Sequence, residues 1–236
     1  MRALVCLVAV LAFAEASLDA VAKDVPEFLS QPITPSKREI YYKILDRKLL
    51  MTPADLGRMT FRPSFEGEFA VSVYPAAGRS PGSGFRVTLT EASKSIWSSL
   101  TPKQQGYIPA PDVKHNERDT SSQIPVKRID VNIDRELALA IQRTWQAMLA
   151  RNPVPDPDAE RYISVDGYSA ELSVRMPDGK TIIRETSNPH GHPTRDFVQV
   201  GLLLADYCNA PVRDRPKRRK ELLRELQHVL REAQKT

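Results

Sequence analysis

The segment "YSAELSVRMPDGKTIIRET", residues 168–186, indicates the fold class of this chain. From Tyr168 to Val174 apolar and polar side chains alternate, which is typical of a strand with one face toward a core. The sequence "PDG" at 177–179 favours a tight turn, and "KTIIRET" after it has the composition of a returning strand. We therefore predict a β-hairpin whose apolar face packs against helices.

A second hairpin is predicted earlier in the chain. Residues 65–73 and 85–89 show the same alternation, and a loop rich in Pro, Gly and Ser separates them. The alternation predicts that the first of these strands is half-buried, with Glu68 and Ser72 on its polar side. We expect the two strands to pair across the long loop.

A further strand is predicted over residues 124–133. Its apolar positions change phase between Val126 and Ile129. A change of phase by one residue inside a strand is usually accommodated by a β-bulge, so we expect a bulge near Lys127 and Arg128.

Helices are predicted on both sides of the hairpins. Capping boxes are expected at Ser36 with Glu39 and at Thr101 with Gln104, and Asp134 is expected to cap a long helix. The helices predicted from apolar spacing cover 36–49, 101–104, 134–149, 193–208 and 221–234. Cys208 falls on the apolar face of its helix, and we interpret it as a buried small residue rather than a reactive thiol.

These elements predict an α+β protein with an antiparallel sheet built from hairpins, packed against amphipathic helices, and with a C-terminal amphipathic helix. Because each hairpin follows a helix, two helix-hairpin lobes are an alternative organisation. The predicted boundaries are a signal peptide at 1–16, a proline-interrupted lead-in at 17–35, the α+β domain at 36–210, and a basic linker with a tail helix at 211–236.

The chain begins with the pattern of a secretory signal. Arg2 precedes an apolar run from Ala3 to Ala14, and small residues at 14 and 16 suggest cleavage after Ala16, with a second option after Ala22. The run is shorter than the ~20 residues that a spanning helix needs. We expect a secreted or periplasmic protein without a transmembrane span, and its single remaining thiol, Cys208, excludes an internal disulfide.

The positive charge is concentrated at one end of the chain. The net charge is +5, and residues 211–236 contain nine basic and four acidic residues, whereas 17–210 is neutral. The candidate binding residues are the six cations of this segment's first part: Arg213, Arg215, Lys217, Arg218, Arg219 and Lys220. They suggest an acidic protein or an anionic envelope surface as partner.

Two alternatives remain for this tail. Either its cations bind an acidic partner, or they form a solvated linker while the leucine stripe docks on the domain or on a second copy, as a homodimer. Nucleic acid is not expected, because the tail has no aromatic side chains on which bases would stack.

Motifs for catalysis are weak. "GRSPG" at 78–82 matches a hydrolase nucleophile pattern, but a strand follows Ser80 where the mechanism needs a helix. His190 and His192 are weak metal candidates, because the prolines and glycine around them already explain a turn. No cofactor is predicted.

The sequence thus predicts an exported, non-enzymatic binding protein: an inhibitor, immunity-type or adaptor module. The alternative is an exported hydrolase that uses a loop histidine, His115 or His190.

Overall fold

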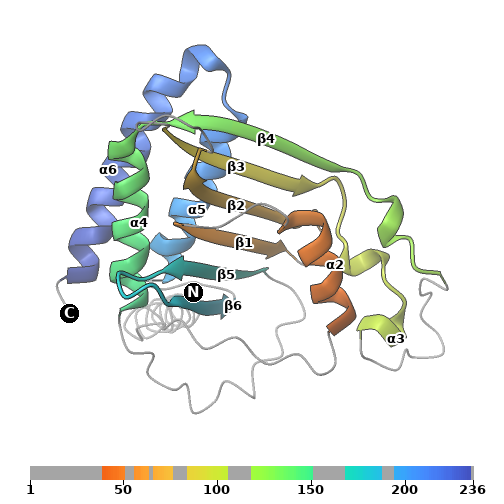
Figure 1. The fold of residues 1–236 in the computed structure, drawn as a ribbon. Coiled ribbons are helices and arrows are strands. Elements are labelled where there is room, and N and C mark those ends of the chain that lie inside the picture. Colours follow the sequence, from red (N-terminus) through yellow and green to blue (C-terminus); the bar gives the residue numbers. More distant parts are fainter. Residues whose placement is uncertain are drawn as a thin grey trace, which may run out of the picture.

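The computed structural model describes residues 39–50, 56–63, 66–76, 84–105, 118–150, 168–187 and 194–234. These residues form one six-stranded antiparallel sheet with helices on both sides (Figure 1). The strands, in sheet order, are β4 Val126–Ile133, β3 Phe85–Ala92, β2 Phe69–Pro75, β1 Gly57–Pro63, β5 Tyr168–Arg175 and β6 Thr181–Ser187. The helices are α2 Glu39–Leu49, α3 Pro102–Gln105, α4 Arg135–Leu149, α5 Thr194–Asn209 and α6 Arg215–Gln234, with 3-10 turns at η1 Trp97–Ser99, η2 Ser121–Gln123 and η3 Val212–Asp214.

The predicted α+β class is confirmed, and so are both hairpins. β2 pairs with β3, and β5 pairs with β6 across a turn in which Gly179 has a φ of 84°. That backbone conformation favours glycine.

The strand β1, which the sequence analysis missed, joins the two hairpins. It pairs with β2 on one side and with β5 on the other, so it lies near the centre of the sheet. Its core-facing residues are Met59 and Phe61, and arginines at 58 and 62 point to the other face. Two apolar residues between arginines are a weak strand signal.

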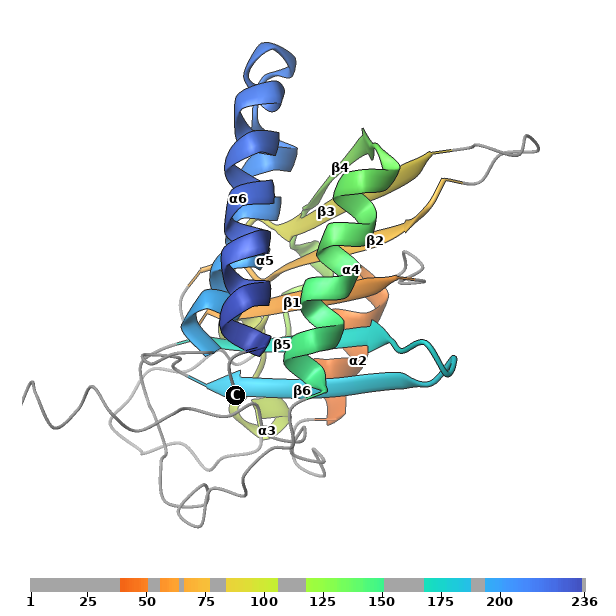
Figure 2. The same cartoon turned by 90° about the vertical axis from the view of Figure 1, so that its left-hand side faces the viewer.

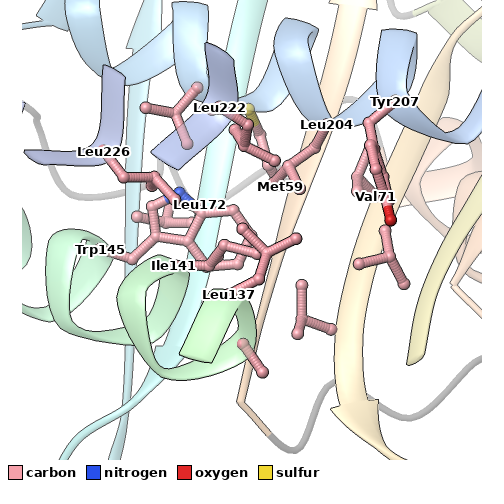
Figure 3. Packing of buried hydrophobic residues seen from close by; sticks show 14 of the residues in the cluster. Met59, Val71, Leu137, Ile141, Trp145, Leu172, Leu204, Tyr207, Leu222 and Leu226 are labelled. Carbon is pink, nitrogen blue, oxygen red and sulfur yellow. The ribbon is translucent and has the colours of Figure 1, made fainter. Parts of the chain in front are cut away.

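The main core lies between one face of the sheet and the helices α4, α5 and α6; in Figure 2, α4 and α6 lie side by side and α5 is partly hidden behind α6. Figure 3 shows Trp145 of α4, Leu226 of α6 and Leu172 of β5 close together in this core. All three side chains are essentially buried. The C-terminal helix α6 is therefore part of the core, and the residues predicted as a basic linker lie in η3 and in the first turns of α6.

Helix α5 crosses the sheet at very short range. A Cβ atom at Gly201 would lie 1.8 Å from the Met59 sulfur, so a larger residue here would require the buried Met59 side chain to move. Cys208, in the same helix, is buried in the core, which confirms its interpretation as a small apolar residue.

A second apolar cluster covers part of the opposite face of the sheet, beneath α2. Tyr41, Leu45 and Leu49 of α2 pack there on sheet and loop residues. Ile124 and Val126 belong to this cluster, while Ile129 faces the main core.

This cluster corrects two predictions from the sequence. The expected bulge near Lys127 and Arg128 is wrong, because β3 and β4 pair in unbroken register from Phe85 with Ile133 to Ala92 with Val126. The phase change arises because both faces of the sheet bury apolar residues. For the same reason β2 is buried on both faces rather than half-buried.

Two predicted caps are confirmed. The Asp134 carboxylate accepts a hydrogen bond from the Leu137 amide (3.0 Å) at the start of α4. At α3 the Thr101 amide donates to the Gln104 side chain (2.9 Å), and the Gln104 amide donates to the Thr101 hydroxyl (3.4 Å). The cap predicted at Ser36 lies outside the described residues.

Candidate binding surface

The six predicted binding cations lie in η3 and in the first half of α6. Figures 1 and 2 show that the connection between α5 and α6 projects beyond the sheet. The structure therefore places these residues on a protruding helical hairpin. Some of these cations contact other parts of the fold, and the others face solvent.

Arg219 serves the fold. Its guanidinium donates two hydrogen bonds to the Asp134 carboxylate, at 2.7 and 3.0 Å, and also contacts Glu136. The hydrogen bond from Arg219 lowers the pKa of Asp134 to about 2. Because Asp134 also caps α4, this contact fixes the start of α6 against the start of α4.

Arg215 also serves the fold, since its guanidinium donates to the Ala210 carbonyl (3.2 Å) just beyond the C-terminus of α5. Cations near the last carbonyls of a helix interact favourably with its dipole. Arg218 pairs with Glu221 at 3.0 Å within α6. Exposed pairs of this kind contribute little to stability.

The remaining cations face solvent. The side chains of Arg213 and Lys217 are 87% and 82% exposed, and Lys220 is exposed too. Lys217 lies 4.0 Å from Glu221, and Arg213 lies 3.8 Å from Asp214, so both ion pairs are loose.

Lys217 and Lys220 belong to a longer row that the sequence analysis did not identify. Residues three, four and seven apart lie on one side of an α-helix. The exposed cations of α6 follow this spacing, and we call them the basic stripe: Lys217, Lys220, Arg224 and Arg231. The helical spacing alone would have revealed the stripe.

The acidic residues of α6 do not lie within the stripe. Glu221, Glu225 and Glu232 occupy the adjacent side of the helix and are partly buried. Within the described part of the chain, no ion pair forms at Lys220, Arg224 or Arg231. The stripe is therefore a row of exposed cations on the side of α6 opposite the leucines that enter the core.

A buried group of charges lies on the other side of the sheet, beneath α2. Arg62 of β1 approaches the Glu185 carboxylate at 2.8 Å and donates to the Tyr42 hydroxyl (2.7 Å). Glu171 lies in the same region, and burial raises its pKa. These contacts join α2, β1 and β6, and we interpret the group as structural.

An open cavity of about 540 Å³ lies at the end of the sheet near η1. The Ser95 hydroxyl accepts from the Ser98 amide (3.1 Å), and the Ser99 hydroxyl donates to the Ile96 carbonyl (2.6 Å). These two hydroxyls thus hold the local turn. The described residues that line the cavity include the ionisable side chains Glu66 and Lys94 and no histidine.

The single cysteine of the core has no reactive character. Burial raises the pKa of the Cys208 thiol to about 12, whereas reactive thiols have lowered pKa values. Within the described ranges, no group of His, Cys, Asp or Glu side chains is arranged to hold a metal ion. Nor does any helix of those ranges combine the length and apolar character that crossing a bilayer requires.

The weaker sequence candidates fall outside the described residues. These are the histidines at 115, 190 and 192 and the serine at position 80. The metal and hydrolase hypotheses attached to them therefore stay predictions.

Comparison of the chain with protein-family models, with curated proteins and with solved structures gives no match.

Proposed function

We propose that this chain is an exported, non-enzymatic binding protein that recognises an anionic partner through the basic stripe of α6. The sequence pattern of residues 1–16 supports export. A protein of this kind acts by association, as an inhibitor, immunity-type or adaptor module does.

The observation that carries the proposal is that, among the described residues, no hydrogen bond or ion pair joins the stripe to another element of the fold. Its side chains are exposed on α6, and the core contacts of this helix come from Leu222, Leu226 and Val229 instead. Arg219 and Arg215, by contrast, hold neighbouring elements in place.

The stripe also carries a cost for the helix. Like charges three or four residues apart destabilise a helix by ~0.2–0.5 kcal/mol per pair. Cations in the first turn oppose the helix dipole as well. An anionic partner would offset both the repulsion between the stripe cations and their unfavourable interaction with the helix dipole.

The proposal is tested by binding to labelled poly-L-glutamate, measured by fluorescence anisotropy. The test variant replaces all four stripe cations with glutamine: Lys217→Gln, Lys220→Gln, Arg224→Gln and Arg231→Gln. We expect its affinity to fall at least tenfold. Binding by the natural protein should weaken between about 0.1 M and about 1 M salt, as the Debye length falls from ~10 to ~3 Å.

A matched control removes two lysines and two arginines that are exposed on other elements: Arg47→Gln, Lys94→Gln, Arg175→Gln and Lys180→Gln. This variant has the same net charge as the test variant, so we expect it to keep most of the affinity. Equal losses in both variants would show that only net charge matters and would refute a site on α6.

A further inference from the structure

The hairpin between α5 and α6 exposes an apolar side chain at its tip. Val212 is 74% exposed, which exceeds the other exposed large hydrophobic residues of the described ranges, Ile40 at 46% and Ile183 at 40%. It lies in η3, on the part of the molecule that projects beyond the sheet (Figure 2).

The tip holds Val212 in a fixed turn. The Asp214 amide donates to the Pro211 carbonyl (2.9 Å), and the Arg215 amide donates to the Val212 carbonyl. The Arg215 side chain ties the turn to the end of α5 through Ala210. The valine is therefore presented to solvent by an ordered segment.

Two exposed cations lie close to this valine in the sequence. Arg213 follows it directly, and Lys217 lies in the first turn of α6; both side chains are more than four-fifths exposed, and Arg213 forms a loose pair with Asp214 at 3.8 Å. From Lys217 the basic stripe continues along α6. An exposed apolar residue next to positive charge, on a protruding tip, fits a partner that is anionic at its surface and apolar just beneath it.

We infer that the partner is an anionic lipid bilayer, into which the tip inserts Val212 while the neighbouring cations bind lipid headgroups. This inference rests on the proposed function and names the class of partner. Basic residues near an anionic leaflet are attracted to its surface potential, and apolar side chains bind at the acyl boundary. A soluble acidic protein would use the cations but would give Val212 no apolar layer to enter.

The test is sedimentation of the full chain with vesicles containing about one third phosphatidylglycerol in phosphatidylcholine, beside vesicles of phosphatidylcholine alone. We expect binding to the anionic vesicles only. Val212→Ser should weaken that binding about tenfold, since it removes the buried apolar surface of one valine. Its binding to poly-L-glutamate should not change.

Two further variants sharpen the result. Ile183→Ser removes an exposed apolar residue of β6, far along the chain from the tip, and should leave vesicle binding unchanged. Val212→Trp should strengthen binding, and brominated lipid should quench its fluorescence more than that of the natural protein. Circular dichroism checks that each variant is folded.

Unchanged vesicle binding by Val212→Ser would overturn the insertion of this residue. Binding to poly-L-glutamate without binding to anionic vesicles would overturn the lipid partner, favour an acidic protein, and leave the proposed function intact. Failure to bind either probe would reject the proposed function and the inference together.

Discussion

The two faces of the sheet are covered in different ways. On one face, three long helices bury a continuous apolar core that includes Trp145, Leu172 and Leu226. On the other, the single helix α2 covers a small apolar cluster beside buried polar groups such as Glu68. The stability of the first face depends on how well apolar side chains fill the core. The stability of the second depends on the geometry of hydrogen bonds to buried polar groups.

The largest expected loss of stability comes from a substitution in the core beneath α4, α5 and α6. Trp145 is fully buried between α4, the sheet and α6, so Trp145→Ala should destabilise the protein by about 3–5 kcal/mol. The indole Nε1 has no hydrogen-bond partner among the described residues. Trp145→Phe, which removes this unpaired N–H and keeps most of the ring, should therefore cost much less. Urea unfolding measures both, and equal losses would contradict a core that depends on volume.

A smaller effect is expected on the α2 face. The buried Glu68 carboxylate accepts from the Ile96 amide (2.6 Å), the Trp97 amide (3.0 Å) and the Tyr41 hydroxyl (3.1 Å). Glu68→Ala removes the acceptor of all three hydrogen bonds and should cost about 2–3 kcal/mol. Glu66→Gln, at an exposed position of the same loop, is the control and should change stability by less than about 0.5 kcal/mol. Equal unfolding midpoints for the two variants would show that the carboxylate is dispensable.

The smallest effect concerns the ion pair at the margin of the core. Arg219→Gln should lower stability by about 0.5–1 kcal/mol at pH 7, because both partners remain partly exposed. The pKa of Asp134 is lowered to about 2, so this contribution is complete above the ordinary aspartate range. It should disappear as the pH falls toward 2. Unfolding series at several pH values measure it, with Arg218→Gln as the surface control; a difference that persists in acid would contradict the assignment.

The sequence predicts the face covered by α4, α5 and α6 better than the face covered by α2. The alternation in β5 and the stripe of α4 depend on local periodicity, which a core on one side produces directly. The α2 face depends on contacts between distant segments. Glu68 looks like a solvent-facing residue until Tyr41 and Ile96 are brought to it.

Contacts on the α2 face also explain why the sequence did not reveal β1 and why the predicted bulge is wrong. β1 has arginine at 58 and 62, and a buried Arg62 becomes acceptable only through Glu185 and Tyr42. The bulge was predicted because the pattern of β4 was assigned to one core, although Val126 packs on the second cluster. Periodicity does not report how many faces of a sheet are covered.

The candidate surface was predictable in part. Composition located the cations in residues 213–220, and the helical spacing from Lys217 to Arg231 was readable as well. The internal role of Arg219 was not readable, since its partner Asp134 lies 85 residues away in the sequence. Separating cations that hold the fold from cations that are free required the tertiary structure.

The ion pair between Arg219 and Asp134 fixes which side of α6 faces the core. Each residue of an α-helix advances the rotation about the helix axis by about 100°. Inserting or deleting one residue between Arg219 and Leu222 would rotate these side chains relative to each other, so either the ion pair with Asp134 or the leucine contacts would be lost. Because the leucines of α6 point into the core, the basic stripe on its opposite side points outward, so the direction of the stripe cannot change without a change in the core contacts.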